Sequence, residues 1–323
     1  MKKLFCVMLT VILTLSLFAG CGTKADDGVI NVAIIQQLDH SSLDEIRLAI
    51  EAELDKIAAE KNLTIEYKHF NGQNDTSILG QIGTQVVADQ YDLIIPIATL
   101  AAQYAVTAAE GTNIPIVYAA ISDPVGAGLT GLPNVTGVSD ALNTPFIMDM
   151  MFEADPDIQC VGLLYSLSEP NSETPIAEAK AYLEAKNIPY IEKTGNTADE
   201  VITAASALVG RCDAVFTPTD NAIMNVAPSV AEILNKAGIA HYTGADSFVT
   251  AGSFATCGVN YTELGTYTAR MAMDIMQGGT LPEYHVMEGG IITVNSDTAK
   301  ALGLNIEQFK TMANTLITVE TAE

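Results

Sequence analysis

Residues 92–101 read DLIIPIATLA and residues 213–222 read DAVFTPTDNA, and the two segments follow one pattern. In each, an acidic residue opens a buried apolar strand and a proline stands near the end of that strand. Seven positions after the acid comes a residue that favours helix N-termini, Thr99 or Asp220. We therefore predict two similar α/β lobes, each with its own sheet. A chance likeness between two unrelated strand–helix units is the alternative.

The pattern around these segments alternates between strand and helix. Apolar residues at helical spacing follow Ser42-Leu-Asp-Glu45, which reads as a capping box. Strand and helix segments of this kind continue to the C-terminus, which indicates a doubly wound α/β architecture. The clearest predicted strands are 29–35, 64–69, 92–97, 114–121, 158–165, 212–216, 239–243 and 255–259, and a second early helix is predicted over 76–89.

The N-terminus has the layout of an export signal. Two lysines precede an apolar run, Leu4–Phe18, and small residues stand just before Cys21. We predict a signal peptide over residues 1–20. The run before Cys21 also resembles a bacterial lipobox, which implies a lipidated Cys21 and a polar spacer to residue 28. An ordinary cleaved signal with a chance cysteine is the alternative.

Charge and composition narrow the classes of partner. The formal net charge is −24, so the surface repels nucleic acid and anionic lipid head groups. Cys160, Cys212 and Cys257 lie in apolar runs without C-x-x-C spacing and read as buried free thiols. The four histidines are scattered without metal-ligand spacing, so no metal site and no cofactor is expected.

Ligands of open α/β sheets bind beyond the carboxyl ends of the strands. Two such lobes facing each other would place Thr99 and Asp220 on opposite walls of one cleft. The helix start at Thr99 offers free N–H groups, which suit a carboxylate, whereas Asp220 offers a carboxylate for an ammonium group. This pairing suits a zwitterionic amino acid. Both residues could instead serve only as helix caps.

Other polar residues follow predicted strands and join the candidate site. None of the common catalytic motifs is present: there is no G-x-S-x-G elbow, no P-loop and no G-x-G-x-x-G after a strand. Tyr165 or Tyr261 could stack on a ligand side chain. The predicted ligand-binding residues are Gln36, His40, Thr99, Ser122, Asp123, Tyr165, Asn171, Ser172, Thr219, Asp220, Asn221 and Asp246.

Several segments together resemble the substrate-binding lipoproteins of bacterial ABC importers, in the branch that binds tryptophan and other aromatic amino acids. The most specific are Ser122-Asp-Pro-Val-Gly-Ala-Gly-Leu129, Asn134-Val-Thr-Gly-Val-Ser-Asp140 and Pro218-Thr-Asp-Asn221. The likeness runs from about residue 29 to 304. Two cleft positions depart from the family pattern, Ser41 and Leu100, where the family often has proline.

The resemblance implies two Rossmann-like lobes of the type I periplasmic-binding-protein kind, joined by crossing segments. The expected lobe limits are 29–121 with 247–279 for the first lobe, and 122–246 with 280–323 for the second. It also implies an ABC permease as partner and attachment to the outer face of the membrane through the lipid.

The predicted function is capture of a small solute by closure of the two lobes. We expect an amino acid, and an aromatic one as the narrower expectation. Three rival functions stay open: a binding lipoprotein for nucleosides or sugars, an exported enzyme, and a sensor domain. An enzyme would need a nucleophile or metal constellation. A sensor would normally continue into a transmembrane helix, which no segment after residue 28 provides.

Overall fold

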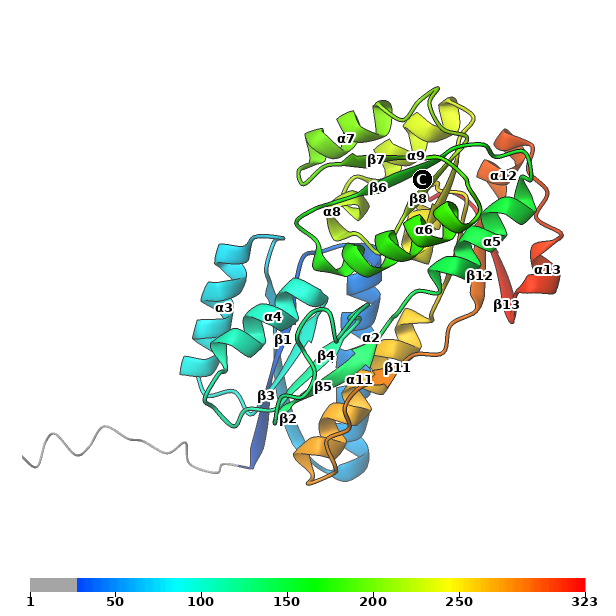
Figure 1. Cartoon of the computed structure of the whole chain (residues 1–323). Coiled ribbons are helices and arrows are strands. Elements are labelled where there is room, and N and C mark those ends of the chain that lie inside the picture. The colour runs from blue at the N-terminus through cyan, green and yellow to red at the C-terminus, as the bar shows by residue number, and fades with distance from the viewer. Residues whose placement is uncertain (1–27, 323) are drawn as a thin grey trace, which may run out of the picture.

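The computed structural model describes residues 28–322, which form two α/β lobes joined by crossing segments (Figure 1). Each lobe is built on its own sheet, as the repeated strand–helix pattern predicts. The predicted signal peptide, Cys21 and nearly all of the spacer lie outside the described residues. Within residues 28–322, no helix has both the length and the hydrophobicity that a membrane span requires.

The sheet of the first lobe is entirely parallel. Its strands lie in the order β2-β1-β3-β4-β5-β11, so their carboxyl ends share one edge. The strands are β1 (Val29–Gln36), β2 (Thr64–Asn71), β3 (Leu93–Ile97), β4 (Ile116–Ala119), β5 (Val135–Ser139) and β11 (His285–Val286).

The sheet of the second lobe has the order β7-β6-β8-β9-β10-β12-β13. All pairings are parallel except that between β10 and β12, which is antiparallel. The strands are β6 (Val161–Tyr165), β7 (Tyr190–Thr194), β8 (Ala214–Thr217), β9 (Ala240–Thr243), β10 (Ala255–Gly258), β12 (Ile291–Asn295) and β13 (Thr315–Val319).

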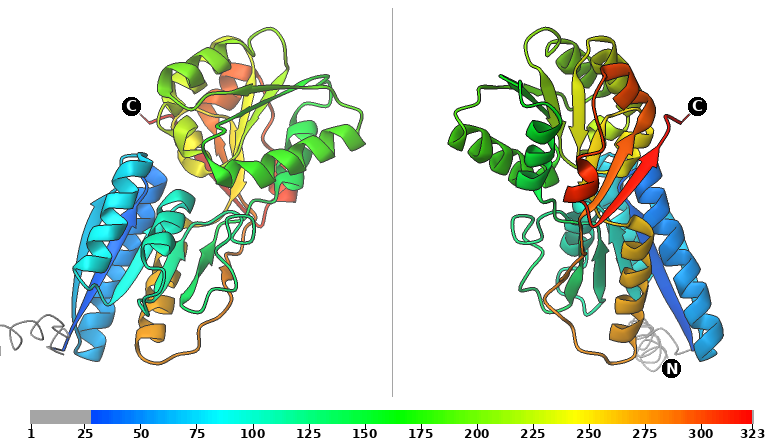
Figure 2. Two further views of the ribbon diagram at one scale, coloured as in Figure 1. Left: turned by 60° about the vertical axis from the view of Figure 1, so that its left-hand side comes forward. Right: turned by 90° about the vertical axis from the view of Figure 1, so that its right-hand side faces the viewer.

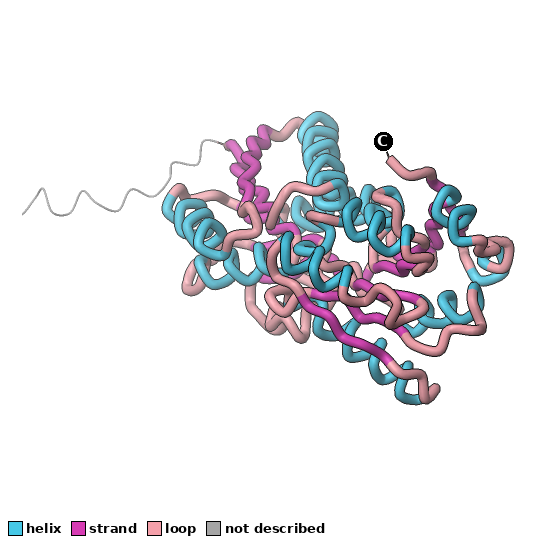
Figure 3. Tube along the Cα trace, turned by 90° about the horizontal axis from the view of Figure 1, so that it is seen from above, coloured by secondary structure: helices cyan, strands magenta, loops and turns pink. Residues whose placement is uncertain are grey.

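Helices cover both faces of each sheet (Figure 3). In the first lobe α2 packs against α11 on one face and α3 against α4 on the other. In the second lobe α5 packs against α6, and α7 against α9. The first-lobe helices are α2 (Ser41–Lys61), α3 (Thr76–Ala88), α4 (Thr99–Ala108) and α11 (Tyr261–Met276). The second lobe has α5 (Thr144–Ala154), the 3₁₀ turn η1 (Pro170–Ser172), α6 (Glu173–Ala185), α7 (Ala198–Ser206), α8 (Asn221–Met224), α9 (Ala227–Lys236), α10 (Asp246–Thr250), α12 (Ser296–Leu302) and α13 (Phe309–Met312).

The central strands are buried on both faces, which is why they read as continuous apolar runs. In β1, Val32 and Ile34 join the core under α2 and α11, whereas Ala33 and Ile35 join the core under α3 and α4. Cys212 and Cys257 are buried free thiols, as predicted, and Cys160 is half-buried and also free.

The chain passes between the lobes three times, after β5, after β10 and after β11 (Figure 2). Three of the expected lobe limits are wrong, as the observed strand pairing shows. Residues 122–139 return to the first sheet, because β5 pairs with β4. Residues 247–258 stay in the second lobe, because β10 pairs with β9, and 280–286 belong to the first, because β11 pairs with β5. The lobe limit expected after Ile121 is therefore wrong, because residues 122–134 form a loop within the first lobe.

Two predicted helix starts are wrong in detail. Helix α2 begins at Ser41, and the expected capping box is absent because Ser42 Oγ donates to Ser247 Oγ. Glu45, its other expected member, accepts a hydrogen bond from Thr262. Thr99 is the first residue of α4 rather than its cap. The cap predicted at Asp220 is present, since its side chain accepts from the Ile223 N–H.

Candidate functional site

The carboxyl ends of the two sheets face each other across a narrow cavity of about 30 Å³ between the closed lobes. Both lobes contribute to its walls. The lining residues are His40, Ser42, Leu43, Ala98, Thr99, Ala120, Ser122, Asp140, Asn171, Thr219, Asp220, Asn221, Met224, Ala245, Ser247, Phe248 and Tyr261. Seven of the predicted site residues are therefore brought together: His40, Thr99, Ser122, Asn171, Thr219, Asp220 and Asn221.

A buried acid that was not among the predicted site residues stands at one end of the first-lobe wall. Asp140 directly follows β5, and its carboxylate accepts hydrogen bonds from Ser122 Oγ (3.0 Å) and the Tyr261 hydroxyl (3.2 Å). Both donors are neutral, and no Lys or Arg is among the described residues that line the cavity. Burial raises the pKa of Asp140. A cationic group that enters the cavity would supply the counter-charge that this carboxylate lacks.

Three buried polar atoms of the cavity lining have no hydrogen-bond partner among the described residues: His40 Nδ1, Thr99 Oγ1 and Asn171 Oδ1. The Asn171 amide group donates to the backbone carbonyl of Thr219, so its oxygen is the free atom. A buried polar atom without a partner costs free energy and is rare in native proteins. Three such atoms around one cavity indicate that a polar ligand forms the missing hydrogen bonds.

The backbone at the ends of β3 and β4 is strained. Ala98 has φ +75° and Ala120 has φ +56°, a region that residues other than glycine seldom adopt. Both line the cavity, and Ala98 immediately precedes α4. Strain of this kind concentrates at binding sites, where it positions the backbone. Here it brings the N-terminus of α4, the positive end of the helix dipole, to the cavity wall beside Thr99.

Asp220 differs from the role expected for it. Its Oδ1 accepts from the Ile223 N–H (3.0 Å), and its Oδ2 accepts from the Ser166 N–H (2.6 Å) and from Ser172 Oγ (2.7 Å). The carboxylate is fully buried and its oxygens are occupied by donors of its own lobe. The arrangement supports the alternative in which Asp220 caps a helix.

A second buried acid, Glu169, joins the lobes beside the cavity. Gln37 of the first lobe donates to its Oε1 (3.0 Å), and Asn221 donates to its Oε2 (2.8 Å). The Leu100 N–H donates to the Gln37 side-chain oxygen, which fixes the orientation of that amide. Burial, followed by the negative charge of Asp220, raises the pKa of Glu169 to about 8.

Further hydrogen bonds cross between the lobes around the cavity. His40 Nε2 lies 3.0 Å from Asn221 Oδ1, and Ser122 Oγ lies 3.0 Å from Thr219 Oγ1. With the Gln37–Glu169 and Ser42–Ser247 contacts, these form a polar seam between the two sheet edges. The lobes are therefore closed on each other through hydrogen bonds that are individually weak.

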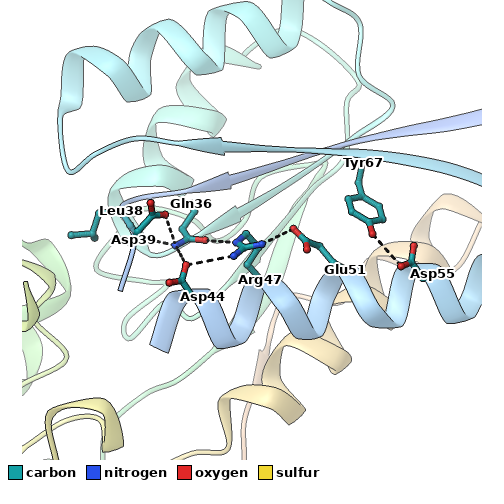
Figure 4. Close-up of polar contacts among 8 residues, drawn as sticks. All are labelled: Gln36, Leu38, Asp39, Asp44, Arg47, Glu51, Asp55 and Tyr67. Carbon is teal, nitrogen blue, oxygen red and sulfur yellow. Dashed lines mark hydrogen bonds and ion pairs between the residues drawn. The ribbon is translucent and has the colours of Figure 1, made fainter. Parts of the chain in front are cut away.

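Other predicted site residues serve as structure. Gln36 lies beneath α2, where its side chain donates to Leu38 O and Asp44 and accepts from Arg47 (Figure 4). Asp123 accepts from the Gly126 N–H and from Thr174 Oγ1, outside the cavity. Both residues were predicted from the rule that ligands bind beyond the carboxyl ends of strands, here called the strand-end rule. The rule gives the position of a residue but not the direction in which its side chain points.

Three more predicted residues do not line the cavity. Tyr165 donates to Glu192 on the far side of β6, and Ser172 lies behind the wall, bonded to Asp220. Asp246 opens α10, and burial together with the charge of Glu45 raises its pKa to about 6. Tyr261, considered for stacking, does line the cavity. Asp140 could have been found by the same strand-end rule, because it directly follows β5.

The comparisons agree with this geometry. The sequence profile of the family described as "ABC transporter substrate binding protein" matches residues 31–314. A tyrosine-binding protein of Clostridioides difficile is 30% identical over 94% of this chain and 93% of its own length. An ABC domain from Streptococcus pneumoniae, solved with L-Trp, is 28% identical, with a TM-score of 0.82 over 89% of this chain and 99% of that one.

A third relative is a substrate-binding protein with adhesive properties from Clostridium difficile, solved ligand-free and open. It is 30% identical, with a TM-score of 0.68 over 90% of this chain and 99% of that one. The fold and the interlobe cavity define a type I periplasmic-binding-protein-like architecture, as predicted. The chain belongs to the family of ABC transporter substrate-binding proteins. Its role is binding rather than catalysis.

Proposed function

We propose that the cavity captures an amino acid with an aromatic side chain and that closure of the lobes holds it for delivery to an ABC permease. The observation that carries the proposal is the set of three unpartnered atoms, His40 Nδ1, Thr99 Oγ1 and Asn171 Oδ1, around a cavity that also holds the uncompensated acid Asp140. The tyrosine-binding relative and the relative solved with L-Trp support an aromatic ligand.

In this proposal Asp140 holds the ammonium group, and Asn171 Oδ1 accepts a further N–H from it. Both residues contact the Ser122–Thr219 pair, which links them into one cluster. The carboxylate is held by Thr99 Oγ1 at the N-terminus of α4, where the helix dipole favours negative charge. The acid expected for the ammonium, Asp220, is replaced in this role by Asp140.

The closed arrangement is what the proposed capture mechanism requires. The TM-score against the relative solved with L-Trp is 0.82, and against the ligand-free open relative it is 0.68, although the identities are 28% and 30%. This difference supports a closed state like that of the ligand-bound relative. Closure would bury a ligand between opposed strand ends.

Calorimetry with L-tyrosine and two truncated analogues tests the proposal. Tyramine lacks the carboxylate, and 3-(4-hydroxyphenyl)propanoate lacks the ammonium group. We expect L-tyrosine to bind and each analogue to bind at least tenfold more weakly, because each leaves one buried group of the protein unpaired. Equal binding of the propanoate would exclude an ammonium site. Binding of neutral sugars or nucleosides, with no response to amino acids, would favour that alternative class.

We further propose that residues 1–20 are removed and that Cys21 carries the lipid which holds the protein on the outer face of the membrane. The sequence pattern before Cys21 supports this. Mass spectrometry of the membrane fraction should find a lipid-modified N-terminal Cys21, and Cys21→Ser should release the protein. An unmodified mature N-terminus elsewhere would contradict lipidation.

A further inference from the structure

His40 lies away from Asp140 and Thr99, the residues proposed to hold the ammonium and carboxylate groups of the ligand. Along the carboxyl edge of the first sheet, Asp140 follows β5, Ala120 follows β4, Thr99 follows β3, and His40 lies beyond β1. Three strand spacings of ~4.8 Å separate the acid from the histidine, roughly 14 Å along the edge. An ammonium at Asp140 and a carboxylate at Thr99 place the ligand's α-carbon near Ala120. The ligand side chain would then extend toward β1 and His40.

The surroundings of His40 suit an aromatic ring. Leu43, Met224 and Phe248 line the same cavity and belong to one apolar cluster. Leu43 lies on α2 immediately beyond His40, and Met224 lies one turn beyond Asn221, the residue that contacts the histidine. The Ser42–Ser247 contact brings Phe248 to the same side of the cavity.

The imidazole of His40 is held in place by a chain of hydrogen bonds. Its Nε2 contacts Asn221 Oδ1, Asn221 donates to Glu169, and Gln37 donates to the other oxygen of Glu169. The second ring nitrogen, Nδ1, is buried and has no partner among the described residues. Burial lowers the pKa of His40, so the ring is neutral and carries no charge for a carboxylate.

We propose that His40 Nδ1 forms a hydrogen bond with a polar group at the tip of the ligand's side chain, so that the protein prefers a hydroxylated aromatic amino acid over its unsubstituted counterpart. The inference rests on the proposed amino-acid function and identifies His40 as the residue that recognises the ligand's side chain. Asn221 Oδ1 accepts from Nε2–H, so Nδ1 of the neutral ring is an acceptor, and a phenolic hydroxyl can donate to it. A phenyl ring leaves Nδ1 buried and unpaired.

Calorimetry with L-tyrosine and L-phenylalanine on the wild type and on His40→Leu tests the inference. In the wild type we expect L-tyrosine to bind at least tenfold more tightly, because a site built to pair a hydroxyl rejects the analogue that lacks it. In His40→Leu the ratio of the two dissociation constants should fall to within about threefold of unity, mainly through weaker tyrosine binding. His40→Gln, which keeps a polar tip, should restore part of the preference.

Asp140→Asn is the matched control, because it acts at the ammonium group that both ligands share. It should weaken tyrosine and phenylalanine by the same factor and leave their ratio unchanged. Equal loss of both ligands in His40→Leu would overturn the inference, as would a wild type that binds the two equally. The wild-type comparison needs no variant to fold. If the wild type binds no amino acid at all, the proposed function itself fails.

Discussion

Asp140 and Asp220 are both buried acids beyond the end of a strand, yet their surroundings give them different roles. Asp220 is paired with two backbone N–H groups and a serine hydroxyl of its own lobe. Asp140 accepts from the neutral hydroxyls of Ser122 and Tyr261 and faces the cavity, where no described lining residue is a Lys or Arg. A buried carboxylate is tolerated when it is well paired, so the poorly paired acid is the one that gains most from a cationic ligand.

Asp140→Asn should weaken amino-acid binding by about 2–5 kcal/mol, because the ligand's ammonium would enter a buried site without its counter-charge. Calorimetry measures this loss directly. Thermal unfolding of the ligand-free variant should not fall, because the substitution removes a buried charge of raised pKa. Asp55→Asn serves as the control, since Asp55 lies on α2 away from the cavity and accepts from Tyr67 of its own lobe, and its affinity should match the wild type. An unchanged affinity in Asp140→Asn would remove this acid from the site.

Glu169 should make stability depend on pH. Its pKa is raised from an ordinary value of 4.5 to about 8, so between these values the folded protein holds a proton that the unfolded chain has released. Stability should therefore fall as pH rises from about 4.5 to 8 and then level off. Buried neutral histidines act in the opposite sense below pH 6.5, since burial lowers the pKa of both His40 and His241.

Glu169→Gln isolates this contribution, because the histidines remain in both proteins. The difference in unfolding free energy between wild type and variant, measured by denaturant titration from pH 5 to 9, should change with pH in favour of the variant as pH rises. Parallel pH profiles for the two proteins would show that Glu169 does not take up a proton on folding.

At the scale of single residues, the strand-end rule predicted the positions of site residues better than the directions of their side chains. It placed His40, Thr99 and Asn171 at the cavity, where each has an unpartnered atom. It also selected Gln36, which is bonded to its own lobe. Which side chain faces a cavity depends on local dihedrals and on neighbours distant in sequence, and a strand pattern does not contain that information.

At the scale of elements, α8 depends on its cap. The helix has a single turn, and the Asp220 side chain satisfies the Ile223 N–H while also accepting from Ser166 and Ser172 in the segment between β6 and α6. Asp220→Ala should cost at least the ~0.5–2 kcal/mol of an N-cap, since it also leaves the buried Ser166 N–H unpaired. Denaturant unfolding measures the loss. Stability equal to that of the wild type would contradict the capping role.

The element pattern was largely predictable. Long amphipathic segments such as α2 have core positions at helical spacing, and buried strands such as β3 read as continuous apolar runs. Helix starts were less predictable, because Ser42 has a partner in the other lobe rather than in its own first turn. A residue that favours capping binds whichever donor or acceptor the tertiary structure brings to it.

At the scale of the whole molecule, the polar seam lets the lobes separate at modest cost. The interlobe contacts include hydrogen bonds among side chains such as His40–Asn221 and Ser122–Thr219, which water can replace when the cleft opens. We expect the ligand-free protein in solution to be more open, and small-angle scattering should show a smaller radius of gyration after addition of L-tyrosine. An identical radius with and without ligand would contradict hinge closure.

Ligand binding should also raise the stability of the whole chain. At a free ligand concentration of about one hundred times the dissociation constant, the gain is about 2.7 kcal/mol, measurable as a shift in thermal or denaturant unfolding. The shift should grow with ligand concentration. A shift that did not depend on concentration would indicate a nonspecific effect.

The two-lobe architecture was predictable because the segments at 92–101 and 213–222 repeat one pattern. The limits of the lobes were not, because they depend on which strands pair. Strand β5 returns to the first sheet after a turn-rich loop, and β10 stays with the second. Pairing between strands far apart in the chain is set by tertiary packing, which local patterns do not report.

The packing of α2 against α11 has a consequence for the order in which the protein can mature. Helix α2 leaves the ribosome early, but the surface that covers it arrives only with residues 261–276. Until then α2 can pack on β1, β2 and β3, but its side that faces α11 stays uncovered. The first lobe therefore cannot complete its core until the last fifth of the chain has been made.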